Sequence, residues 1–257
     1  MATRTARTTA LASYVLHHYD WSESSVILDL FTRERGRIAV AAKGARRPFS
    51  QLRSVLLPFQ RLQVSLGREP PGHDAREVHT LRGADWAGGH PMLSGAALFS
   101  GFYLNELLMK LLARHDPHAL LFDAYASTIA ALSSGDEAGT QTALRAFELV
   151  LLREIGLLPD LGTETASHRP VRAEGRYLVL ADAGVVETHD ENDAVVTGAT
   201  LSALEMALAT DLPALQRVAA GALAALRPLL RAQLHYHLGT SQLRTRQVMI
   251  EAQALDR

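Results

Sequence analysis

The sequence contains no cysteine among its 257 residues. Such a chain cannot form disulfides, use a thiolate nucleophile, or hold an iron–sulfur cluster or a cysteine-ligated zinc ion. Its hydrophobic fraction of 47% is ordinary for a globular protein and argues against wholesale disorder. At roughly 150 residues per domain, the length predicts about two domains.

Long apolar runs and nucleotide-binding loops are also lacking. The apolar stretch at residues 10–16 is too short for a secretory signal, and the uncharged run at 86–105 contains too many turn residues for a membrane helix. Motifs of the forms GxxxxGK[ST], GxGxxG and GxSxG are absent, and the histidine spacings do not suit a metal. We therefore expect a soluble, cytoplasmic protein and predict no catalytic residue, no metal site and no cofactor.

The formal net charge of −1 conceals a strong asymmetry along the chain. Residues 1–82 hold 13 Lys and Arg but only 7 Asp and Glu, whereas the remaining 175 residues hold 13 basic and 20 acidic side chains. The first part therefore carries +6 and the second −7. A basic segment of this kind indicates a module that binds a polyanion.

The hydrophobic period changes at about the same point in the chain. Alternating patterns predict five short strands, at residues 13–18, 25–32, 37–43, 59–68 and 77–81. Five short antiparallel strands in about 80 residues fit a small closed barrel of the OB-fold type. The long stretch between the third and fourth strands, residues 44–58, is predicted to be a polar, basic loop.

Beyond residue 90 the pattern becomes helical. Leucines at 104, 107, 108, 111 and 112 form one stripe, and further helices are expected over 116–133, up to Gly156, from near Leu201, and over 215–238 with a kink or division at Pro228. Ser202 and Glu205 match a capping box. The predicted fold class is therefore α+β, with an OB-fold domain at residues 1–85 and an α-helical domain at residues 86–257.

The most informative segment is residues 36–59. Arg37 and Lys43 fall on the same strand face, with the small side chains of Ala39 and Ala41 between them, and such a face lets a nucleic-acid backbone approach. An aromatic residue among cations can stack on an unpaired base. The candidate DNA-binding residues are Arg35, Arg37, Lys43, Arg46, Arg47, Phe49, Arg53 and Arg61. The alternative is a solvated basic loop with Phe49 packed into the barrel.

Three segments carry a family resemblance. The first comprises Val15-Leu16-His17, Trp21-Ser22-Glu23-Ser24-Ser25, Leu28-Asp29-Leu30-Phe31-Thr32, Gly36-Arg37, Ala42-Lys43-Gly44-Ala45-Arg46-Arg47 and Leu57-Pro58-Phe59. The others are Leu144-Arg145-Ala146-Phe147-Glu148 with Leu152, Gly156 and Pro159-Asp160-Leu161, and Leu238-Gly239 with Leu243-Arg244-Thr245-Arg246. In this order they resemble the bacterial RecO-type recombination mediator proteins of DNA repair.

The resemblance implies a non-enzymatic mediator that binds single-stranded and duplex DNA and anneals complementary strands. It also implies work with the single-strand-binding protein and a ring-forming, RecR-type partner to load recombinase, in the cytoplasm at the nucleoid. By family position, the residues that would bind the acidic tail of the single-strand-binding protein are Arg145, Phe147, Leu151 and Arg153. An ordinary amphipathic helix with Arg145 solvated is the alternative there. For the whole chain, the alternatives are an OB-fold module that binds RNA or another polyanion, and an enzyme.

One departure from the family is clear. Many members carry four cysteines in a zinc-binding insert after the Pro-Asp-Leu stretch, but the matching residues here, about 162–190, contain none. His168 and His189 alone do not make a structural zinc site. We therefore expect a degenerate, metal-free version of the zinc-finger-like insert, with a small hairpin over residues 177–187.

Overall fold

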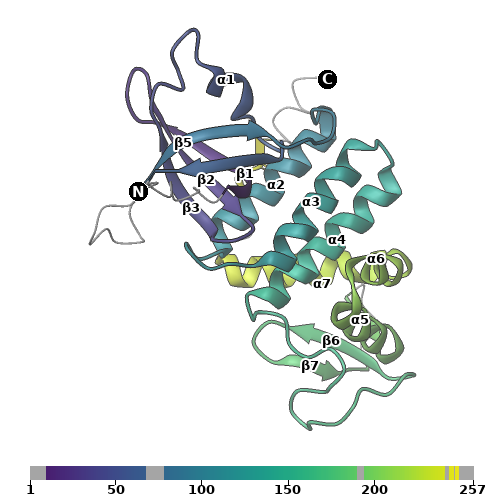
Figure 1. The fold of residues 1–257 in the computed structure, drawn as a ribbon. Coiled ribbons are helices and arrows are strands. Elements are labelled where there is room, and N and C mark those ends of the chain that lie inside the picture. The colour runs from purple at the N-terminus through teal and green to yellow at the C-terminus, as the bar shows by residue number, and fades with distance from the viewer. Residues whose placement is uncertain (1–9, 68–77, 190–193, 241–242, 246, 249–257) are drawn as a thin grey trace, which may run out of the picture. The chain divides into compact units, whose positions relative to one another are not determined.

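In the computed structural model, residues 10–67, 78–189, 194–240, 243–245 and 247–248 are described. The chain divides into two compact units, residues 1–133 and 134–257. The elements of the first unit are β1 (Leu11–Asp20), β2 (Val26–Thr32), β3 (Gly36–Ala42), α1 (Gln51–Val55), β4 (Leu62–Leu66), β5 (His79–Trp86), α2 (Gly95–Leu111) and α3 (Ala119–Ser133) (Figure 1).

The five strands of the first unit close into a barrel with the order β1-β2-β3-β5-β4. Neighbouring strands are antiparallel except for β3 and β5, which pair in parallel. Leu28 pairs with Val40 and Leu30 with Ile38, so that one face of each strand fills the apolar interior. The predicted OB-fold barrel is confirmed. Its fourth and fifth strands differ in extent from the prediction, and residues 68–77 lie outside the described residues.

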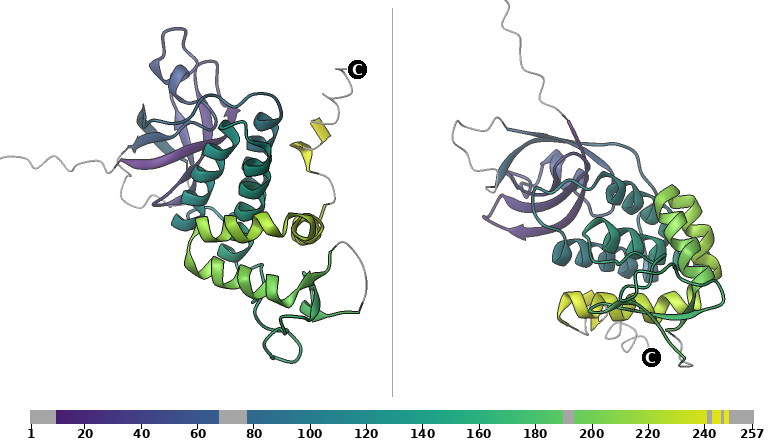
Figure 2. Two further views of the ribbon diagram at one scale, coloured as in Figure 1. Left: turned by 90° about the vertical axis from the view of Figure 1, so that its right-hand side faces the viewer. Right: turned by 90° about the horizontal axis from the view of Figure 1, so that it is seen from below.

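The outer face of β2 is buried as well, which alternation alone did not predict. Phe31 packs against Phe122 and Tyr125 of α3, with ring centroids 5.4 and 6.0 Å apart. The Tyr125 hydroxyl donates a hydrogen bond to Asn105 Oδ1 on α2 (2.7 Å), and Asn105 Nδ2 donates to the carbonyl of Leu16 on β1 (2.9 Å). The two helices therefore belong to the same compact unit as the barrel (Figure 2).

The hairpin between β2 and β3 requires glycine. Gly36 has a φ of +66°, and a Cβ at this position would lie 1.9 Å from the carbonyl oxygen of Asp116. The hairpin therefore docks on the chain between α2 and α3, where the His115 amide donates to the carbonyl of Arg37 (3.0 Å). These contacts place the turn at residues 33–36 against the helices.

The second unit is mostly helical. Its elements are α4 (Glu137–Glu154), β6 (Arg176–Leu180), β7 (Gly184–Glu187), β8 (Val196–Thr197), α5 (Gly198–Thr210), α6 (Leu212–Gly221) and α7 (Leu223–Leu238). Asp136 caps α4 by accepting the amides of Ala138 and Gly139, and Gly156 follows the helix in the left-handed conformation. The helical domain that the sequence predicted is thus confirmed in this unit.

The expected hairpin of the insert is confirmed as β6 and β7, with β8 added at the other edge of β6. Val179 and Val185 are buried, and the buried Gln233 side chain of α7 donates a hydrogen bond to the carbonyl of Val179 (2.9 Å). Thr165 Oγ1 accepts the amide of Val185 (2.8 Å). Packing and hydrogen bonds therefore hold this insert, and within the described residues no cluster of three or more His, Asp or Glu could hold a metal ion.

Several predicted boundaries were wrong. Helix α1 lies within the expected loop. Helix α5 is capped by Thr197, because it begins at Gly198 and Ser202 lies inside it, and Glu205 binds Arg153. The division of the last helical segment falls at Ala222, where the backbone is not helical. Pro228 lies inside α7, where a missing amide costs one hydrogen bond without ending the helix. No helix in the described ranges is long and apolar enough to cross a membrane.

Candidate nucleic-acid interface

Two loops of the first unit meet at one end of the barrel. The Arg46 amide donates to the carbonyl of Ser24 (3.0 Å), and the Gly44 amide donates to Ser25 Oγ (3.3 Å). Arg46 Nη1 also lies 3.1 Å from Asp20 Oδ2. We call residues 19–25 and 43–53, which these contacts join, the basic end of the barrel.

Local turns present the side chains of the basic end to solvent. Gly44 has a φ of +75°, and its carbonyl accepts the amide of Arg47 (3.1 Å), whose own carbonyl accepts the amide of Ser50 (3.0 Å). Lys43 and residues 46–49 are exposed, whereas Ala45 between them is buried in the barrel core.

Phe49 is the most exposed large hydrophobic side chain in the described residues, with 96% of its surface accessible. The alternative interpretation, in which Phe49 packs into the barrel, is therefore wrong. Lys43, Arg46, Arg47 and Arg53 are also exposed and surround it in sequence. An aromatic ring held in water among four cations has no role in the core and is suited to stacking on a base beside phosphates.

The outer face of β3 differs from the prediction. Ala39 and Ala41 are buried, so the smooth surface expected between Arg37 and Lys43 is not open. The Arg37 guanidinium donates hydrogen bonds to the carbonyls of Leu108 and Met109 at the end of α2, and burial lowers the pKa of this group. Arg37 therefore stabilises a helix C-terminus, where backbone carbonyls lack partners.

Arg35 and Arg61 are exposed but lie away from the basic end. Arg35 belongs to the turn at residues 33–36, and because Val26 pairs with Ala42 and Thr32 with Gly36, this turn lies at the opposite end of the β2–β3 hairpin. Arg61 immediately precedes β4, whose first residue pairs with Ser13. The structure thus brings together five of the eight predicted residues: Lys43, Arg46, Arg47, Phe49 and Arg53.

Sequence reasoning missed two aromatic side chains at the basic end. Tyr19, the last residue but one of β1, has 45% of its surface exposed, and Trp21 in the following loop is 55% exposed. Burial and the nearby Asp29 carboxylate raise the pKa of Tyr19. The available signal was the composition of the loop, because a tryptophan between Asp20 and Ser22 has no apolar neighbour along the chain to bury it.

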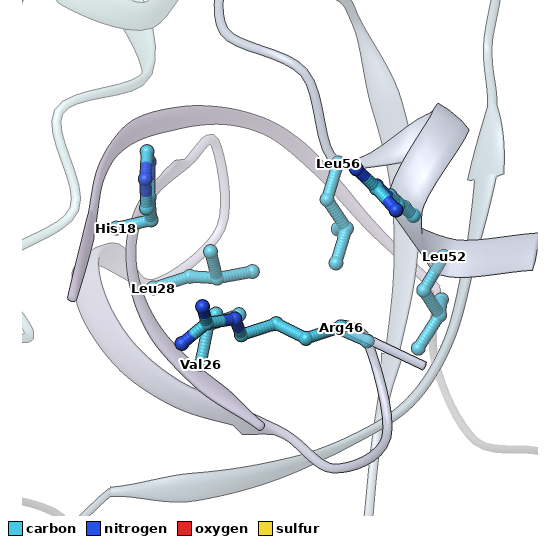
Figure 3. A pocket seen from close by; sticks show the side chains of 8 residues that line it. His18, Val26, Leu28, Arg46, Leu52 and Leu56 are labelled. Carbon is cyan, nitrogen blue, oxygen red and sulfur yellow. The ribbon is translucent and has the colours of Figure 1, made fainter. Parts of the chain in front are cut away.

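A pocket of about 370 Å³ opens at this end of the barrel (Figure 3). Its apolar lining comes from β2 and from α1, and the Arg46 side chain extends across it toward Val26. The lining residues are His18, Val26, Leu28, Ala45, Arg46, Leu52, Arg53 and Leu56. Two of the five clustered residues, Arg46 and Arg53, thus form part of its wall.

In the second unit, the residues predicted to bind a partner's tail do not form a groove. Phe147 and Leu151 are fully buried in the core. Arg145, only 15% exposed in its side chain, lies 2.8 Å from the buried Glu148, and Arg153 binds Glu205 at 2.6 Å. A helical stripe marks a core-facing surface as readily as a groove, and here it marks the core. Arg172, an exposed cation of the same unit, pairs with Glu187.

A closed barrel of this strand order, with cations and exposed aromatic rings gathered at one end, defines an OB-fold protein with a candidate surface for a polyanion. The family model described as "Recombination protein O N terminal" matches residues 7–87, and "Recombination protein O C terminal" matches residues 92–247. The chain belongs to the recombination protein O family.

Similar proteins cover nearly the whole chain. A protein from Polaromonas sp. (strain JS666 / ATCC BAA-500) that is named DNA repair protein RecO is 49% identical over 245 residues, which is 95% of this chain and 96% of the relative. Proteins of the same name from Variovorax paradoxus (strain S110) and Delftia acidovorans (strain DSM 14801 / SPH-1) are 50% and 49% identical, with the same coverage. The resemblance that the sequence motifs indicated is confirmed.

Proposed function

We propose that this protein acts in DNA repair by binding single-stranded DNA at the basic end of its barrel. The observation that carries the proposal is Phe49, fully exposed beside Lys43, Arg46, Arg47 and Arg53. Cations that contact phosphates release counterions, and an exposed ring adds stacking that does not depend on sequence. The name of the curated relatives, DNA repair protein RecO, supports the same role.

Strand annealing follows from this chemistry without any catalytic residue. Two complementary strands repel each other through their phosphates, and neutralisation at the basic end lowers that repulsion. A ring that stacks on one base leaves the pairing edge of that base accessible. We propose that the protein thereby holds strands close enough to pair, and that it does not act as an enzyme.

The wider role that we propose is that of a mediator. The protein would act on DNA coated by single-strand-binding protein, together with a ring-forming, RecR-type partner, to help load recombinase at the nucleoid in the cytoplasm. The family to which the chain belongs supports this role. We propose the barrel, about residues 1–85, as the DNA-binding part, and residues 86–257 as the part that meets proteins. The helices α2 and α3 pack on the barrel and belong to the same compact unit as the barrel.

Competition separates this proposal from RNA or general polyanion binding. A labelled 30-mer of single-stranded DNA is bound by the protein and then challenged with unlabelled DNA, RNA or heparin of matched charge. We expect DNA to compete at least as well as RNA, and annealing of complementary oligonucleotides to accelerate. Preference for structured RNA, or Mg²⁺-dependent cleavage of the strand or of ATP, would contradict the proposal.

A further inference from the structure

The pocket at the basic end combines an apolar floor with a cationic rim. Val26 and Leu28 belong to the interior face of β2, and they are faced by Leu52 of α1 and by Leu56, which directly follows α1 (Figure 3). Leu52 and Leu56 pack against the barrel core and are only partly buried. The pocket therefore has an apolar floor beside residues proposed to contact phosphates.

The rim of the pocket carries the charge that a nucleotide needs. The guanidinium groups of Arg46 and Arg53 line it together with the imidazole of His18. Arg46 is held across the opening by Asp20 at 3.1 Å, and both side chains are largely exposed, with 44% and 67% of their surfaces accessible. An exposed ion pair of this kind contributes little free energy, so a phosphate can replace the carboxylate at small cost.

The shape of the pocket limits what can enter. A volume of about 370 Å³ is near the lower end of the range for small-molecule sites, which admits one base with its sugar and excludes a duplex. Aliphatic walls bind the faces of a base by dispersion, and His18 offers nitrogen atoms to its polar edge. Phe49 lies in the chain between Arg46 and Arg53, which both line the pocket, but Phe49 does not line it itself. Its exposed ring is available to stack on another base of the same strand.

We propose that this pocket binds one unstacked nucleobase of a single strand, with the adjoining phosphates on Arg46 and Arg53. The inference rests on the proposed DNA binding and adds a base-specific site to it. An acidic peptide with an apolar end would meet the same chemistry in part. The nucleobase is favoured because two cations of the basic end, Arg46 and Arg53, form part of the pocket wall, which suits a strand that carries a phosphate on either side of each base.

The test compares an ordinary single-stranded 20-mer with an abasic 20-mer, which has the same phosphates and no bases. The pocket variant is Leu52→Trp, which fills the pocket, and its matched control is Leu57→Trp, since Leu57 is exposed and does not line it. Ala45→Leu is a second variant that fills the pocket. Thermal melting of each protein shows whether it remains folded. Affinities are measured by fluorescence anisotropy.

We expect wild type and Leu57→Trp to bind the ordinary strand about 5- to 100-fold more tightly than the abasic strand. Both filling variants lose the part of this difference that the pocket supplies and keep the part that comes from stacking on Phe49, while their affinity for the abasic strand is unchanged. Retention of the full difference in folded filling variants would overturn the pocket and leave the proposed function intact. Failure of wild type to bind either strand would overturn both the pocket and the proposed function.

A peptide probe tests the alternative occupant. If an acidic peptide that ends in phenylalanine binds wild type, fails to bind Leu52→Trp and is not displaced by DNA, the pocket is a peptide site instead.

Discussion

The carboxylate of Asp20 lies 3.1 Å from the guanidinium of Arg46, at the point where the two loops of the basic end meet. The pair neutralises a cation that the proposed function assigns to DNA. Because both side chains are largely exposed, the pair contributes little to stability. The Asp20 carboxylate therefore competes with a DNA phosphate for the Arg46 guanidinium.

Removal of the Asp20 carboxylate should strengthen DNA binding. For Asp20→Asn we expect a severalfold higher affinity for single-stranded DNA at low salt, because Arg46 is released and a negative charge is lost. The matched control is Glu23→Gln, which removes the same charge from an exposed position in the same loop. Equal affinities for the two variants would show that the ion pair has no specific effect. Anisotropy titrations at 50 mM salt provide the measurement.

Loss of the exposed ring should weaken binding without affecting the fold. For Phe49→Ala we expect about 5- to 100-fold lower affinity for single-stranded DNA, corresponding to roughly 1–3 kcal/mol of stacking. The free energy of unfolding should not fall, because the side chain is 96% exposed. Phe49→Trp should retain the affinity. If Phe49→Ala binds as well as wild type, stacking on Phe49 does not contribute to DNA binding.

The pair formed by Arg145 and Glu148 should govern the stability of the second unit. Arg145→Met leaves a fully buried carboxylate without its cation, and we expect a loss of about 3–5 kcal/mol in urea unfolding. Arg217→Met, at an exposed position of α6, is the control and should change stability by less than about 0.5 kcal/mol. If Arg145→Met proves as stable as this control, the pair is not structural. Reduced partner binding by an Arg145 variant is therefore interpretable only after its folding has been measured.

Alkaline pH should destabilise the first unit through Tyr125. Burial raises the pKa of this tyrosine well above its ordinary value of 10.0, because the tyrosinate would lose its solvation. The contribution to stability is therefore complete below about pH 10 and falls as the pH rises above it. Tyr125→Phe should show lower stability at pH 7, from the lost hydrogen bond to Asn105, and a shallower decline above pH 10. Identical slopes for the two proteins in denaturant titrations between pH 8 and 11 would contradict this explanation.

Local patterns predicted the barrel well and the burial of its outer face poorly. Alternation in β2 correctly placed Leu28 and Leu30 inside, because a strand has two faces and one was continuously apolar. It could not show that Asp29 and Phe31, on the other face, are buried too, since that depends on helices from residues 95–133. The hydrogen bonds from Arg37 to the end of α2 were not predicted for the same reason, since they also depend on a helix that is distant in the sequence.

The candidate site, too, was predicted where it depends on local sequence and missed where it depends on distant contacts. Residues 44–58 were predicted as a polar, basic loop, and the structure adds the short helix α1 within that loop. Trp21 was not identified as a site residue, since its loop reaches the basic end only through the contact between Ser24 and Arg46. Phe147 and Leu151 were assigned to a partner's tail by family position, and the structure places both in the core of the second unit.

The salt dependence of DNA binding tests the central claim most directly. Each phosphate contact to a single strand contributes about 0.7 to the slope of log affinity against log salt. For Lys43→Ala/Arg46→Ala/Arg47→Ala we expect a slope reduced by about 2 and a loss of affinity at low salt. The matched control, Arg217→Ala/Arg227→Ala/Arg231→Ala, removes the same charge from exposed positions of α6 and α7 and should leave the slope near that of wild type. A basic-end variant with the affinity and slope of wild type would contradict the account.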